Sequence, residues 1–189
     1  MSTTTTDIPG YVTGSWTIDP VHSDVSFVVR HMVVSKVRGS FRTFEGTLVT
    51  GETPEQSSVT ASIAMDSIDT NDEQRNGHLR SADFFEVEKH PTMTYQSTAI
   101  RQDGGDWLID GDLTLKGVTK QIPLTLELNG FGPDAYGGYR AGFSAKGEIN
   151  RKDFGVNFHV AMESGGLLVA DKVTILLEIE AILDKPAEG

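Results

Sequence analysis

Val25-Ser-Phe-Val-Val-Arg-His31 and, after a short loop, Val37-Arg-Gly-Ser-Phe41 are the two stretches that decide the fold. In both stretches every second residue points to the same face, and that face is mostly apolar while the other is mostly polar. This period of two is typical of β-strands that bury one side and expose the other. The two stretches therefore predict a hairpin that forms one wall of an apolar container, with His31 at its rim.

The same alternation recurs along the rest of the chain, which predicts about eight strands. The remaining strand-like segments are residues 59–65, 93–97, 107–115, 122–128, 141–149 and 173–181, with turn signals at 51–54, 103–105, 116–117 and 133–138. An open sheet of this kind would leave exposed edges, and closure into an antiparallel barrel removes them. We predict one all-β domain over residues 15–184, preceded by a disordered tail (1–14) and followed by a flexible C-terminus (185–189).

Small residues occur often on the predicted inward faces. They are Gly39, Ala61, Ser97, Gly111, Ala141, Ala145 and Gly147. Because small side chains leave room inside an eight-stranded barrel, they favour a ligand cavity over an interior filled by side chains. A flattened barrel that is packed shut is the alternative.

One segment departs from the strand period and predicts a short helix near residues 71–82. Thr70-Asn-Asp-Glu73 has the form of a capping box, in which Thr70 is the N-cap and the helix runs over 74–82. A second segment, Asn150-Arg-Lys-Asp-Phe-Gly155, predicts a single helical turn.

Composition limits the classes of function. The chain has 189 residues, a formal net charge of -11 and no cysteine. Such an acidic protein lacks the cationic footprint that nucleic acid requires, and the absence of cysteine excludes disulfides and thiolate metal sites. The first ten residues have neither the basic nor the apolar region of a signal peptide, so we expect a cytoplasmic protein.

Two local features run against the acidic average. Lys36, Arg38 and Arg42 form a basic stripe, which either meets an anionic group or simply wets an outer face. Residues 32–34 form an apolar loop tip, which either contacts a membrane or dimer partner or plugs the end of the barrel. A transient membrane contact is therefore among the expected partners.

The sequence offers no catalytic or metal-binding constellation. The five histidines, His22, His31, His78, His90 and His159, have no metal-ligand spacing, and the nucleophile and phosphate-binding motifs are absent. We therefore expect no enzyme, no metal and no cofactor. His31 either donates a hydrogen bond to the polar head of a ligand or is satisfied by a neighbouring carbonyl group.

Several longer motifs appear in a specific order and spacing. They are Trp16-Thr-Ile-Asp-Pro-Val-His-Ser23, Phe27-Val-Val-Arg-His-Met32, Ser35-Lys-Val-Arg-Gly-Ser-Phe41, His78-Leu-Arg-Ser-Ala-Asp-Phe-Phe85, Gly111-Asp-Leu-Thr-Leu-Lys-Gly-Val-Thr-Lys120, Gly142-Phe-Ser-Ala145 and Asn150-Arg-Lys-Asp-Phe-Gly155. Together they make the chain, from Trp16 to about Leu183, resemble the YceI-like family of lipid-binding proteins. The resemblance implies an extended, lipocalin-like barrel of eight antiparallel strands with an elongated apolar cavity. It also implies a polyisoprenoid ligand, such as an isoprenoid quinone, a homodimer, and no assigned catalytic residues.

We therefore predict a protein that carries or stores a polyisoprenoid lipid. The predicted ligand-binding residues are Phe27, Val29, His31, Phe41, Phe84, Phe85, Tyr95, Phe143, Phe154 and Phe158. The alternatives are an enzyme that acts on such a lipid with His31 or another cavity histidine as general base, and an interaction module with a packed, empty barrel.

Overall fold

Strands make up most of the chain in the computed structural model, which describes residues 8–32, 34–158 and 169–184. The strands are β1 (Gly14–Ile18), β2 (Asp24–His31), β3 (Ser35–Phe41), β4 (Phe44–Thr50), β5 (Ser58–Ala64), β6 (Ile68–Asp69), β7 (Thr92–Asp103), β8 (Asp106–Leu115), β9 (Val118–Pro133), β10 (Tyr139–Asn150) and β11 (Val169–Leu183). The helical elements among the described residues are α1 (Glu73–Arg80) and three 3₁₀ turns, η2 (Pro54–Gln56), η3 (Met65–Ser67) and η4 (Arg151–Phe154). None of the helices in this part of the chain is long and apolar enough to cross a bilayer.

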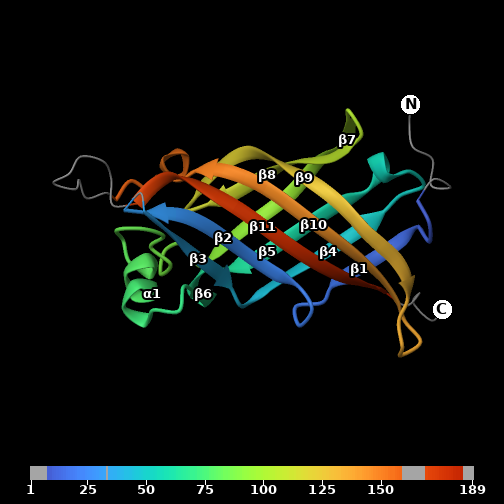
Figure 1. The fold of residues 1–189 in the computed structure, drawn as a ribbon, viewed down its shortest axis with the longest axis horizontal. Coiled ribbons are helices and arrows are strands. Elements are labelled where there is room, and N and C mark those ends of the chain that lie inside the picture. The colour runs from blue at the N-terminus through green and yellow to red at the C-terminus, as the bar shows by residue number, and fades with distance from the viewer. Residues whose placement is uncertain (1–7, 33, 159–168, 185–189) are drawn as a thin grey trace.

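The strands close into the predicted antiparallel barrel. β11 pairs with β10 on one side, and on the other it pairs with β2 along its first part and with β1 along its last three residues. β1 and β2 thus act as one interrupted barrel strand, and β3 and β4 act as another, so the closed barrel has eight strands. The barrel is elongated, with α1 toward one end and β1 toward the other (Figure 1).

Tight turns join the longest strands where the sequence predicts them. Lys116 and Gly117 connect β8 to β9 with φ values of 52° and 77°, and Gly104 and Gly105 connect β7 to β8 with φ values of 58° and 95°. Two successive residues with positive φ give a hairpin turn whose twist matches that of the strands. These turns set the registers of β7, β8 and β9.

The helix lies in the predicted segment but begins differently. Asp72, not Thr70, is the N-cap, because its side chain accepts a hydrogen bond from the backbone N–H of Arg75 at 3.1 Å. Thr70 is buried, and its hydroxyl donates to Oδ1 of Asn76 at 2.6 Å. The predicted capping box is therefore wrong, because the buried Thr70 hydroxyl bonds to the side chain of Asn76 and not to the backbone of Glu73. The predicted single turn over residues 150–155 is confirmed as η4, which Asn150 caps.

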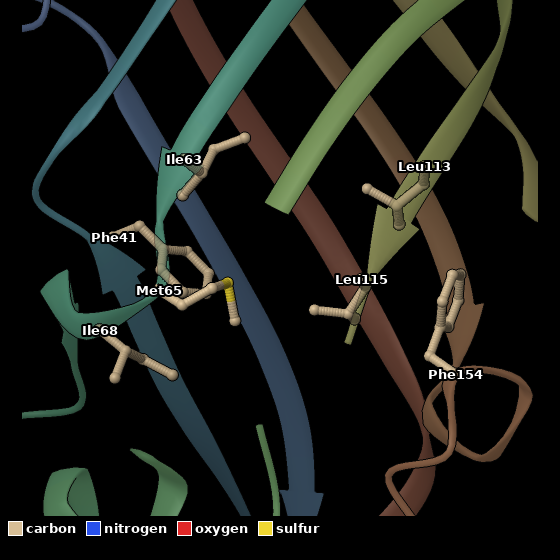
Figure 2. Packing of buried hydrophobic residues seen from close by; sticks show 7 residues of the cluster. All are labelled: Phe41, Ile63, Met65, Ile68, Leu113, Leu115 and Phe154. Atoms are coloured by element: carbon tan, nitrogen blue, oxygen red, sulfur yellow. The ribbon is translucent and has the colours of Figure 1, made fainter. Parts of the chain in front are cut away.

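Two clusters of buried residues lie at the two ends of the barrel. At the α1 end, the largest of the buried clusters joins β3, β5, β6 and β8 to η3 and η4. Its members are Phe41, Ile63, Met65, Ile68, Leu113, Leu115 and Phe154 (Figure 2). At the other end, the fully buried Trp16 packs against Ala141 and Ala181, and its Nε1 donates to Oγ1 of Thr50 at 2.9 Å.

The N-terminal segment joins this second cluster. The ring of Tyr11 lies 5.3 Å from that of Phe131, and its hydroxyl donates to the carbonyl of Gly51 at 2.8 Å. Residues 1–7 lie outside the described residues. Tyr11 thus packs the segment before β1 against the barrel.

Candidate functional site

An apolar cavity of about 280 Å³ lies inside the barrel. All eight barrel strands contribute inward-facing side chains to its wall, including Val25 from β2, Ile109 from β8, Leu126 from β9 and Ile175 from β11. The lining extends from Leu79 and Val156 at the α1 end to Tyr11 at the β1 end. A long, apolar space of this kind suits a hydrocarbon chain rather than a compact polar metabolite.

Seven of the ten residues predicted to bind a ligand line this cavity. They are Phe27, Val29, Phe41, Phe84, Phe85, Tyr95 and Phe143. Phe84 and Phe85 come from the segment after α1, so the helical insertion helps to form the wall at that end. The period of two thus accounts for the five strand residues of this set, and the segment after α1 contributes the other two.

The other three predicted residues lie elsewhere. Phe154 is 0% exposed and belongs to the packed cluster at the α1 end, not to the lining. Phe158 packs behind Phe84, with ring centroids 5.1 Å apart, and its ring also meets that of His78. His31 is half-buried at the end of β2 and is not among the described lining residues.

Aliphatic residues missing from the ligand-binding prediction form much of the wall. Leu124 and Leu126 of β9 and Ile175, Leu177 and Ile179 of β11 all line the cavity. The alternation within residues 122–128 and 173–181 already identified their face, but the prediction favoured aromatic residues.

Two aromatic side chains of the wall lie flat over glycines on neighbouring strands. A Cβ atom added at Gly39 would stand 2.2 Å from Cζ of Phe27, and one added at Gly111 would stand 2.3 Å from Cζ of Tyr95. The Tyr95 ring crosses β8 at Gly111, and its hydroxyl donates to the carbonyl of Ile122 on β9 at 2.9 Å. Burial raises the pKa of Tyr95 well above its ordinary value. The neutral hydroxyl is thus a fixed part of the wall.

Arg151 is the one cation among the described lining residues, and only 4% of it is exposed. Its guanidinium donates to four backbone carbonyls, those of Val156 (2.8 Å), Phe158 (2.6 Å), Val169 (3.3 Å) and Ala170 (3.1 Å). Burial lowers its pKa, and Asp171, 3.6 Å away, opposes that effect. Arg151 therefore joins η4 to the start of β11, and its donors are committed to the backbone.

The polar side chains buried elsewhere along the wall are also paired. Tyr11 donates to Gly51, and its hydroxyl lies 3.2 Å from Oγ of Ser57. Oγ1 of Thr50 donates to the carbonyl of Val12 at 2.7 Å. The described lining contains no histidine, and His159 lies outside the described residues. The cavity therefore offers shape and apolar surface to a ligand, with few free polar groups.

A charged cluster lies on the outside of the barrel, at the β1 end. Nη1 of Arg140 lies 2.8 Å from Oδ2 of Asp19, and Nε of Arg140 lies 2.9 Å from Oδ2 of Asp134. Hydrogen bonds from His22 and Arg140 lower the pKa of Asp19 from its ordinary 3.8 to about 2. Asp19, His22 and Glu180 have ligand atoms close enough to share a cation. Arg140 already supplies positive charge to Asp19 and Glu180, so the cluster is explained as an ion-pair network.

Comparison with known proteins identifies relatives over nearly the whole chain. A family model described as a YceI-like domain matches residues 16–181. The protein YceI of Escherichia coli is 39% identical over 165 residues, which are 87% of this chain and 83% of that protein. A UPF0312 protein of Photorhabdus laumondii is 37% identical over 180 residues, or 95% of this chain and 85% of that protein.

Solved structures share the barrel. Burkholderia cenocepacia BcnA superposes with a TM-score of 0.69 at 26% identity, covering 86% of this chain and 98% of that one. A polyisoprenoid binding domain from Saccharophagus degradans, implicated in plant cell wall breakdown, has a TM-score of 0.68 at 17% identity and covers 92% of this chain and 100% of that one. At that identity the second likeness concerns the fold.

Proposed function

Since the chain belongs to the YceI-like family, we propose that its barrel binds a polyisoprenoid lipid, such as an isoprenoid quinone, and carries or stores it. The observation that carries the proposal is the continuous apolar lining between the two ends of the barrel. The Saccharophagus degradans domain, which is named for polyisoprenoid binding, supports it through the shared fold.

The energetics favour a ligand with a hydrocarbon tail. An isoprene unit has five carbons, and burial of each methylene-sized group contributes roughly 0.8 kcal/mol, so one unit contributes on the order of 4 kcal/mol before ordering costs. A few units therefore supply useful affinity without any specific polar contact. We expect the length of the cavity to select the length of the tail.

The pairing of the buried polar groups favours a head group that stays outside the barrel. The side chains of Tyr95, Thr50 and Arg151 already donate hydrogen bonds to backbone carbonyls. A polar head inside the cavity would lose its water without gaining these partners, which is costly. The tail thus enters the cavity while the head stays at an end of the barrel.

Two variants on adjacent residues of β10 test the proposal. Ala145 lines the cavity, whereas the neighbouring Lys146 is exposed on the outer face. Ala145→Trp adds an indole inside the barrel and should reduce loading with an isoprenoid quinone at least tenfold, because the indole takes space that the tail needs. Lys146→Trp adds the same group outside and should load normally. Ala61→Leu is a milder second filling variant, in case Ala145→Trp does not fold.

Tryptophan fluorescence can follow the loading of quinone into the cavity. Trp107 lines the cavity, while Trp16 is fully buried and is not among the lining residues, so a bound quinone should quench Trp107 more strongly. Trp107→Phe separates the two signals, and solvent extraction with mass spectrometry identifies lipid retained on purification. The proposal is overturned if well-folded protein neither retains nor takes up an isoprenoid, or if Ala145→Trp and Lys146→Trp load equally. Light scattering and cell fractionation test two further predictions, the homodimer and the cytoplasmic location.

A further inference from the structure

The turn between β2 and β3 presents apolar side chains to solvent. Val34 is 87% exposed and Met32 is 41% exposed, and both belong to the few large apolar residues that the described part of the chain leaves in water. Met32 has a positive φ of 55°, which fits a tight turn between the two strands. The turn lies at the same end of the barrel as α1 (Figure 1).

Three exposed cations flank this turn on the outer face of the hairpin. Arg30 is paired in register with Lys36, and Arg38 lies opposite Val28 on the same face. Within the described residues none of the three makes an ion pair, unlike Arg42, which pairs with Asp69. In a chain of net charge -11, this is an unneutralised positive patch beside exposed apolar groups. We call Arg30, Met32, Val34, Lys36 and Arg38 the hairpin patch.

The hairpin patch lies next to the end of the cavity. Val29, one pair inward from Arg30 and Lys36, lines the cavity, and so does Val169, the β11 partner of His31. A surface that meets the hairpin patch therefore comes close to the cavity wall.

We propose that the hairpin patch docks this end of the barrel onto an anionic lipid bilayer. Basic residues are attracted to the negative surface, and exposed apolar side chains enter the boundary between head groups and acyl chains. A second copy of the chain fits less well, because an isologous contact would bring two sets of three cations together. Nucleic acid would leave Val34 without an apolar partner. The docking stands on the hairpin itself and does not require that the cavity ligand be a polyisoprenoid.

Vesicle binding tests the electrostatic part. The probes are vesicles of phosphatidylcholine alone and of phosphatidylcholine with phosphatidylglycerol in a 3:1 ratio, taken at low and high salt. We expect binding only to the anionic vesicles, weakened by salt, and about 30-fold weaker for K36Q/R38Q, from the contribution of each basic residue near an anionic surface. K120Q/K146Q removes the same charge from exposed positions on β9 and β10 and should bind like the unmodified protein.

A second pair of variants tests the apolar part. Val34→Asp should weaken binding at least about tenfold, from the loss of one buried aliphatic side chain. Tyr136→Asp changes an equally exposed residue, 90% accessible, in the turn between β9 and β10, away from α1, and should have no effect. Thermal melts of all variants check that they fold.

The proposal is overturned if the protein ignores anionic vesicles, or if each hairpin variant binds like its matched control. It is also overturned if light scattering shows a dimer that Val34→Asp converts to a monomer, because a second copy then covers the hairpin patch. Quinone loading from detergent solution is measured in parallel. If the unmodified protein loads quinone but ignores anionic vesicles, this inference alone is overturned. If it docks on anionic vesicles but does not load quinone, the proposed function alone is overturned.

Discussion

Replacing Gly111 with alanine tests whether the Tyr95 ring is a fixed part of the cavity wall. The added Cβ would stand 2.3 Å from Cζ and 2.5 Å from the hydroxyl oxygen of Tyr95, so the ring must move. Overpacking of this kind costs about 1–3 kcal/mol, and loss of the bond to Ile122 costs about 1 kcal/mol more. Alanine recovers about 0.5–1 kcal/mol of backbone entropy relative to glycine. We expect the free energy of unfolding to fall by about 2 kcal/mol.

A matched control exists in the same chain. Gly77 lies in α1, and a Cβ added there meets nothing within 4 Å. Gly77→Ala should therefore raise the free energy of unfolding by about 1 kcal/mol, the difference in helix propensity between the two residues. The same chemical change thus has opposite signs at two sites, and urea unfolding followed by far-ultraviolet circular dichroism measures both.

A double variant separates the contact with Tyr95 from other effects. In a Tyr95→Leu background the ring is gone, so Gly111→Ala should become neutral or slightly stabilising. The two substitutions should therefore couple by about 2 kcal/mol, far above the error of additivity for independent sites. The reasoning is refuted if Gly111→Ala lowers the free energy of unfolding equally in both backgrounds, or has no effect in either.

Three further predictions concern groups outside the Tyr95 contact, and urea unfolding measures each of them. Arg151→Met should lower the free energy of unfolding by about 3 kcal/mol or more, because four backbone carbonyls and Asp171 lose a buried cation; an effect below 1 kcal/mol contradicts this. Asp72→Ala should cost about 1 kcal/mol as a lost N-cap, and an unchanged midpoint contradicts it. The pKa of Asp19 is lowered from 3.8 to about 2, so its carboxylate stabilises the fold above about pH 3.8, and this contribution is lost as the pH falls toward about 2. Arg140→Gln removes one of the hydrogen bonds that lower this pKa, so the free energy of unfolding should fall less steeply between those pH values. An identical pH profile contradicts this.

The sequence predicts the barrel well because a half-buried strand has a simple signature. The alternation in residues 122–128 and 173–181 assigns each side chain to the inside or the outside, and the cavity lining confirms those assignments. The capping residue of α1 is harder to predict, since Thr70 and Asp72 both fit a helix start. Burial of Thr70 against Asn76 decides between them, and burial follows from tertiary packing.

The site is only partly predictable for a related reason. The alternation shows that a residue faces inward, but not whether it meets empty space or another side chain. Phe154 faces inward from η4 and ends fully packed, while Leu177 on β11 reaches the cavity. The burial of Arg151 has no signal in the sequence, because a cation is normally expected at the surface. Its place inside depends on four carbonyls that only the folded chain brings together.

The small inward residues carry a more specific lesson. Their number favours a cavity, and a cavity exists, but the glycines are not where the free space lies. Rings or branched side chains from neighbouring strands occupy the positions above them: Phe27 over Gly39, Tyr95 over Gly111 and Leu124 over Gly147. A ring that lies over a glycine sits close to the backbone of the neighbouring strand, in the space where a Cβ atom would be, and so it leaves the barrel axis free. Glycines of this kind therefore flatten the wall, and we expect an alanine at any of the three to push a side chain toward the axis and narrow the channel for a lipid tail.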